Sequence, residues 1–143
     1  MGKRRISVEK KTKKHNKVVE KIFQDPKILP LLSEGTIKVR LKFPHSKITK
    51  RELTDLIFLK EDAERNLHLY FIEIKTGIFL KGGKAQTQIS TALKYFLREL
   101  PLWKEKELKI LKEKKCFIHS LLIWFPPFQY APQIISYKKL FLK

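Results

Sequence analysis

Apolar and polar residues alternate in two neighbouring segments, which predicts a β-hairpin in the middle of the chain. Residues 53–60 and 67–76 are rich in Leu, Ile, Phe and Tyr, and the polar stretch EDAERN separates them. Such a stretch between two apolar runs is typical of the connection in an antiparallel pair. In the second run, alternation places Glu73 and Lys75 on one face of the strand together with Phe71.

Two more elements are predicted before this hairpin. Apolar residues at helical spacing begin at Val18, and the helix is expected to end before Pro26, because the residue preceding a proline avoids helical backbone. Residues 36–43 alternate, which predicts a strand that completes a three-stranded meander. Its inward residues are expected to be Ile37, Val39, Leu41 and Phe43. Its solvent face is expected to be basic, with Lys38, Arg40 and Lys42.

A helix and at least one strand are predicted after the hairpin. Helical spacing of apolar residues between Ile89 and Leu100 indicates a core-facing helix that starts near Lys84. The apolar run 117–125 is nearly continuous, which is typical of a central strand covered on both faces. Residues 134–142 fit a last strand or a short helix, and both stay open.

The net charge makes a polyanion the expected partner. The chain has 143 residues and a formal charge of +18, while a hydrophobic content of 43% indicates a folded globule. Residues 1–17 hold eight Lys or Arg against one Glu, which predicts a basic arm or the start of the first helix. Residues 18–143 are predicted to form one domain.

We therefore expect DNA rather than a membrane as the partner. The longest apolar runs, such as SLLIWFPPF, are too short to span a bilayer and are interrupted by proline. The single cysteine, Cys116, excludes a disulfide framework or a site built on several thiolates. With no signal-peptide pattern, a cytoplasmic protein is expected. The four histidines share no spacing, so no histidine-centred site is predicted.

Charged residues inside the two apolar runs are the candidate site. Asp55 lies in LTDLIFL, and Glu73 and Lys75 lie in FIEIKTG. Burying an ionised group is costly unless it is paired or binds a metal, so these charges indicate a functional site. An acid two residues before a lysine occurs five times in the chain. Only Glu73 and Lys75 combine that spacing with a strand-like run and a preceding acidic strand.

The order of elements resembles the PD-(D/E)XK nuclease superfamily, whose core runs helix, three strands, helix, strand. Asp55 in TDLIFL and the Glu73-Ile74-Lys75 triplet in FIEIKTG match the superfamily's acid and Glu-x-Lys, over roughly residues 20–125. The resemblance implies an α/β (α+β) restriction-endonuclease-like αβββαβ core with a mixed central sheet flanked by helices. It also implies metal-dependent hydrolysis of phosphodiester bonds in DNA.

Assisting residues are implied by the RecB-type branch of that superfamily. Gln88 on the second helix and Glu20 on the first helix are similar to its supporting Gln and Glu. Ala92 stands where that branch usually has a Tyr, with Tyr95 one turn further on, and Thr54 replaces the Pro before the Asp. Holliday junction resolvases are small basic members of the same superfamily.

The implied chemistry assigns a role to each residue. Asp55 and Glu73 would bind Mg²⁺, or Mn²⁺ as a substitute, together with the backbone carbonyl of Ile74 and with Glu20 as a further candidate ligand. Lys75 would position or deprotonate the attacking water or stabilise the transition state. Glu20 and Gln88 would assist catalysis. Contacts to nucleic acid are expected from Lys38, Arg40, Lys42, Lys81, Lys84 and Tyr95.

Several functions stay open at this point. The leading expectation is an endonuclease that acts on DNA structure or ends, with a homodimer considered for cutting both strands. A Holliday junction resolvase and a RecB-type exonuclease are alternative enzymes. A basic nucleic-acid-binding protein without catalysis is the alternative from another class.

Overall fold

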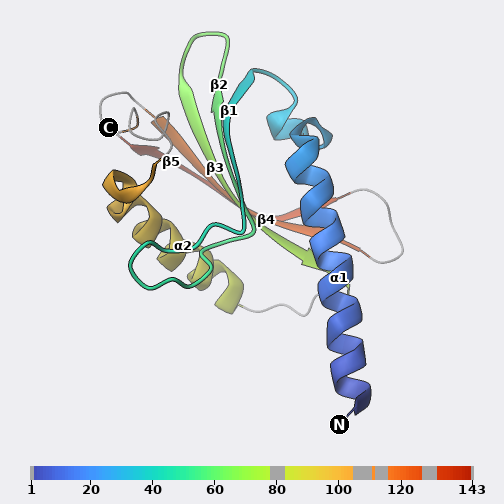
Figure 1. Cartoon of the computed structure of the whole chain (residues 1–143). Helices are drawn as coiled ribbons and strands as arrows, with labels where there is room; N and C mark the ends of the chain where they lie inside the picture. The colour runs from blue at the N-terminus through green and yellow to red at the C-terminus, as the bar shows by residue number, and fades with distance from the viewer. Residues whose placement is uncertain (1, 78–82, 105–110, 112–115, 127–131, 143) are drawn as a thin grey trace.

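The protein is a mixed α/β structure in which two helices flank a five-stranded sheet (Figure 1). The computed structural model describes residues 2–77, 83–104, 111, 116–126 and 132–142. Helix α1 spans Gly2–Gln24 and helix α2 spans Gly83–Arg98. Three short 3₁₀ helices lie at Pro26–Ile28, Pro30–Leu32 and Leu100–Leu102. Within the described part of the chain, no helix has the length and apolar character needed to cross a bilayer.

The sheet contains five strands in the order β1-β2-β3-β4-β5. The strands are β1 (Thr36–Lys42), β2 (Leu56–Glu61), β3 (Leu67–Thr76), β4 (Cys116–Phe125) and β5 (Gln133–Leu142). The first three pair antiparallel, so the predicted meander is confirmed. Strand β4 runs parallel to β3, because the chain crosses over through α2 before it rejoins the sheet. Strand β5 returns antiparallel to β4, and the open choice for residues 134–142 is resolved as a strand.

Each face of the sheet packs on one helix, and the alternation predicted for β3 is confirmed. Ile72 and Ile74 belong to the cluster that contains Val19 and Ile22 of α1. Phe71 belongs to the cluster on the opposite face, which contains the apolar stripe of α2. Both clusters are almost fully buried, which stabilises the fold by about 1.5–3 kcal/mol for each large apolar side chain.

Strand β2 starts later than the sequence pattern predicts. It begins at Leu56, not at Leu53, so Asp55 lies immediately before the strand. The backbone of residues 53–55 pairs instead with the chain that leaves β1: Phe43 N–H donates to Asp55 O at 2.8 Å, and Leu53 N–H donates to Pro44 O at 2.8 Å. Residues 43–55, called the β1–β2 loop below, are therefore closed at their base, and Asp55 is held there.

Four residues of the segment 36–43 were predicted to share one inward face, and this prediction is wrong for two of them. The pairing of β1 with β2 shifts register between Ile37 and Val39, and Phe43 has a positive φ of 48°. Val39 and Leu41 consequently pack in the cluster on the α2 side, whereas Ile37 and Phe43 pack on the α1 side. One extra residue in a strand reverses the face of every side chain before it.

Candidate metal centre

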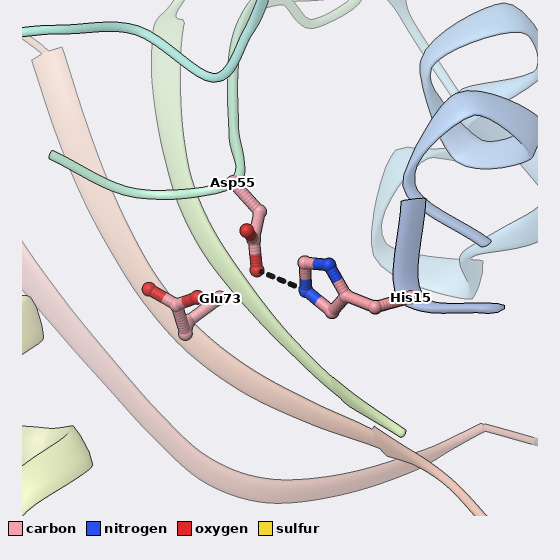
Figure 2. A group of neighbouring side chains, drawn as sticks. All are labelled: His15, Asp55 and Glu73. Atoms are coloured by element: carbon pink, nitrogen blue, oxygen red, sulfur yellow. Dashed lines mark hydrogen bonds and ion pairs between the residues drawn. The ribbon is translucent and has the colours of Figure 1, made fainter. Parts of the chain in front are cut away.

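Three side chains from separate parts of the chain converge at one end of the sheet (Figure 2). His15 comes from α1, Asp55 from the end of the β1–β2 loop and Glu73 from β3. One possible ligand atom from each residue lies within 4.8 Å of the other two. Figure 2 shows the Asp55 carboxylate between the imidazole of His15 and the carboxylate of Glu73.

The backbone of β3 fixes the Asp55 carboxylate. Asp55 Oδ2 accepts a hydrogen bond from Ile74 N–H at 2.7 Å and lies 3.1 Å from His15 Nε2. His15 Nε2 also lies 3.0 Å from Ile74 O. The Ile74 carbonyl, which was predicted as a metal ligand, and Asp55 Oδ2 therefore both lie within 3.1 Å of the same nitrogen of His15.

Glu73 is held beside this pair by its position on β3 and by Thr54. The Thr54 hydroxyl donates to Ile72 O at 2.7 Å and lies 3.5 Å from Glu73 Oε2. Glu73 and Lys75 occupy alternate positions on the same strand, as predicted. Both side chains are half-buried, whereas Asp55 is only 2% exposed.

Burial and mutual repulsion place a proton on the acidic pair. Burial, and then the hydrogen bond and charge of Asp55, raise the pKa of Glu73 to about 9, although the charge of Lys75 opposes this. Burial also acts to raise the pKa of Asp55, but hydrogen bonds with His15 and Glu73 lower it overall. The hydrogen bond with Asp55 raises the pKa of His15. The proton on Glu73 thus compensates charge that a bound cation would otherwise compensate, and the raised pKa of His15 favours a second proton at the same place.

A cleft of about 520 Å³ gives access to Glu73. The β1–β2 loop forms one wall with Thr49, Arg51 and Glu52, and α2 forms the other wall with Thr91 and Tyr95. Of the three-residue group, Glu73 lines this cleft, so a molecule in the cleft would meet the group at the Glu73 carboxylate.

Glu52 adds a further carboxylate near the site, and the sequence pattern does not single it out. Burial, and then the charge of Asp55, raise the pKa of Glu52, and the charge of Glu52 contributes in turn to the raised pKa of Glu73. Glu52 lies in the polar stretch HSKITKRE, which carries no periodicity. Only the folded β1–β2 loop brings it to the cleft.

His15 is the main residue of this group that sequence reasoning missed, because all four histidines were set aside. His15 precedes Val18 and Val19 by about one helical turn, so it continues the apolar stripe of α1. Its neighbours Lys14 and Asn16 are exposed while His15 is half-buried. A polar residue in line with an apolar stripe is the signal that indicates its role.

Glu20, one of the two assisting residues implied by the resemblance, lies outside the three-residue group. The Glu20 carboxylate contacts Lys42 Nζ and accepts a hydrogen bond from Gln24 at 2.9 Å. The side chain of Gln88 lies outside the described residues, as does that of Lys84, and Lys81 lies in an undescribed segment. Their predicted roles stay predictions.

The basic residues predicted to contact DNA have different surroundings. Arg40 donates from one guanidinium nitrogen to the last two carbonyls of α1, at 3.2 and 3.1 Å. Lys42 lies over the Phe23 ring, 5.1 Å from its centroid. Lys38 is exposed, and Tyr95 is exposed on the cleft wall. Arg40 and Lys42 therefore stabilise the packing of α1 on β1, whatever else they bind.

Comparison with known proteins adds no relative to this description. No protein-family model matches the chain, and no curated protein and no solved structure match it. The geometry of the His15, Asp55 and Glu73 group is accordingly the basis on which its chemistry has to be argued.

Proposed function

We propose that the protein is a metal-dependent nuclease of the PD-(D/E)XK type that hydrolyses phosphodiester bonds in DNA. The observation that carries this proposal is the convergence of His15, Asp55 and Glu73, with the Ile74 carbonyl beside His15 and with Glu73 lining a cleft. The chain order α1, β1, β2, β3, α2, β4 also agrees with the αβββαβ order of that superfamily.

The donor set fits a divalent cation and favours Mn²⁺ over Mg²⁺. Two carboxylates and a backbone carbonyl are hard oxygen donors suited to either ion. The imidazole nitrogen of His15 is a softer donor, which suits a transition metal better than Mg²⁺. A divalent ion held by these residues would neutralise charge on the phosphate and lower the pKa of a water molecule.

The surrounding residues prepare the site for this chemistry. Ile74 N–H holds the Asp55 carboxylate, and Thr54 supports Glu73, so both acids are oriented before a substrate arrives. Lys75 lies two residues beyond Glu73 on the same strand, where it would stabilise negative charge on the phosphate or accept a proton from water.

A purely structural role in DNA binding explains the acidic residues less well. A protein that only binds phosphates would gain nothing from Glu52, Asp55 and Glu73 beside one cleft, because carboxylates repel the DNA backbone. The formal charge of +18 supports DNA as the partner in either case. A bound cation would account for the placement of half-buried Glu73 beside buried Asp55 in such a basic chain.

Cleavage assays with supercoiled, single-stranded and branched DNA test the proposal. We expect cleavage with Mn²⁺, weaker cleavage with Mg²⁺ and none in EDTA. Asp55→Asn and Glu73→Gln should each abolish cleavage but preserve retardation of DNA on a gel. DNA that is retarded yet uncut at every metal concentration would refute the nuclease and support the binding protein. Product lengths would separate an endonuclease from an exonuclease.

A further inference from the structure

The β1–β2 loop has a second fixed point, at its tip, that the proposed chemistry does not use. Ser46 organises the tip of this loop: its N–H donates to Arg51 O at 2.8 Å, and its carbonyl accepts Lys50 N–H at 3.0 Å. The Ser46 hydroxyl oxygen accepts from Ile48 N–H at 3.2 Å and from Thr49 N–H at 3.0 Å. These hydrogen bonds join residues 46–51 into one unit, which is called the loop tip below.

Glu99 ties this unit to the end of α2. It follows the last residue of the helix and is only 1% exposed. Glu99 Oε1 accepts hydrogen bonds from the Ser46 hydroxyl at 2.5 Å and from Ile48 N–H at 2.9 Å. Lys47 lies beside this contact, with its ammonium 4.4 Å from the centroid of the Trp103 ring.

Packing does not explain a carboxylate at this position. Glu99 Oε2 and Trp103 Nε1 are both buried without a hydrogen-bond partner among the described residues. No cation of the described part of the chain forms an ion pair with Glu99. A buried carboxylate with an unsatisfied oxygen is costly, so packing alone would favour an apolar side chain of similar size. The two hydrogen bonds to the loop tip are what an apolar side chain could not provide.

The contact between Glu99 and the loop tip joins the two elements that form the walls of the cleft. The loop supplies Thr49 and Arg51 to one wall, and α2 supplies Thr91 and Tyr95 to the other. Glu99 joins the elements that carry these two walls, whereas Asp55 is fixed separately by Ile74 N–H. Loosening the contact would change the spacing of the walls without moving the metal ligands.

We propose that Glu99 is a positioning residue that holds the tip of the β1–β2 loop against α2 and so sets the width of the substrate cleft. The predicted effect of Glu99 on cleavage rests on the proposed nuclease function. The predicted effect of Glu99 on the loop does not rest on that function, because the contact with Ser46 and Ile48 exists whatever the cleft binds.

Three variants and two kinds of measurement test this proposal. Glu99→Leu should raise the amide hydrogen exchange of Ile48 and Thr49 at least roughly tenfold, because their anchor is lost. Ser46→Ala should act in the same direction. The value of kcat/KM for DNA should fall roughly 10- to 100-fold, mainly through KM, as expected for misplaced binding groups. Glu99→Gln keeps an oxygen acceptor and should stay close to the wild type.

Metal binding and thermal stability separate positioning from general damage. The Kd for Mn²⁺ should be the same in wild type and Glu99→Leu, although the Tm of that variant should fall, because the buried Ser46 hydroxyl loses its acceptor. Ile118→Val, a core change in β4 away from the loop, serves as the control. It should lower the Tm but leave exchange at Ile48 and KM unchanged.

Unchanged exchange at the loop tip in Glu99→Leu would overturn the proposal, as would a Glu99→Gln variant as impaired as Glu99→Leu. If the wild type cleaves no DNA, the proposed function fails and exchange alone decides whether Glu99 positions the loop. If the wild type cleaves DNA and Glu99→Leu does so with an unchanged KM, only the positioning role fails.

Discussion

Replacing Glu73 with Gln tests whether Glu73 retains its proton in the absence of a metal ion. Glutamine has the shape of a protonated glutamate, and its amide N–H can donate to Asp55 as the carboxyl O–H does. The variant therefore mimics the protonated side chain at every pH. Its stability in metal-free buffer reports how much stability the wild type loses because Glu73 is ionised in the unfolded chain but protonated in the folded protein.

The size of the effect follows from the pKa of Glu73, which rises from an ordinary value of 4.5 to about 9. Between these values the native state binds more protons than the unfolded chain, so the free energy of unfolding falls as pH rises. One pKa unit corresponds to about 1.4 kcal/mol, which sets an upper limit of about 5 kcal/mol at pH 8. We expect about 2–3 kcal/mol, because Asp55 shares the proton and the cleft admits water when the carboxylate ionises.

Urea unfolding followed by circular dichroism in EDTA measures this difference. Glu73→Gln should be more stable than the wild type by about 2–3 kcal/mol at pH 8 and by less than about 1 kcal/mol at pH 5.5. Mn²⁺ at a hundred times its Kd should add about 2.7 kcal/mol to the wild type, and much less to the variant, which lacks the carboxylate ligand. Glu64→Gln, at an exposed glutamate in the hairpin turn, should leave the pH dependence unchanged. A Glu73→Gln variant that is less stable than the wild type at pH 8 in EDTA would refute the retained proton.

Three further predictions concern neighbouring residues. In the wild type, calorimetry should show Mn²⁺ affinity rising from pH 6 to pH 8, because a proton competes for His15 and its pKa is raised. His15→Ala should reduce this dependence without removing it, because Glu73 must also lose its proton, and it should weaken Mn²⁺ binding more than Mg²⁺ binding. Thr54→Val should lower the free energy of unfolding by about 1–3 kcal/mol in urea, because it leaves the buried Ile72 carbonyl without its donor. Arg40→Ala should cost about 0.5–1 kcal/mol through the lost contacts at the end of α1, while Lys38→Ala should be neutral.

Local patterns were sufficient to predict the elements whose own residues determine them. Strand β3 occupies the predicted residues, because its alternation is uninterrupted and one register alone buries Phe71 on the α2 side and Ile72 on the α1 side. Glu73 and Lys75 follow from the same register. The Pro26 stop and the core stripe of α2 are equally local, and both are found in the structure.

Features that depend on distant contacts were not predictable in the same way. The register shift after Ile37 and the left-handed Phe43 are set by how β1 meets its neighbours, and they invert part of its predicted face. His15 lies 40 residues from Asp55 and 59 from Ile74, so no local spacing relates them. Asp55 itself was predicted within a strand, but residues 53–55 pair with the chain that leaves β1, and β2 begins one residue after Asp55.

The position of His15 connects the basic first helix to the proposed metal site. Below the pKa of His15 the imidazolium serves as the cation beside Asp55, and this contact helps to hold α1 on the sheet. Because that pKa is raised in the folded protein, the stabilisation is complete below about pH 6.5 and is lost as pH rises through the raised value. A divalent ion bound to the neutral imidazole would restore a cation at the same point. Since residues 1–17 of this chain carry eight Lys or Arg, occupation of the metal site would also fix the helix that would present this positive charge to the proposed DNA substrate.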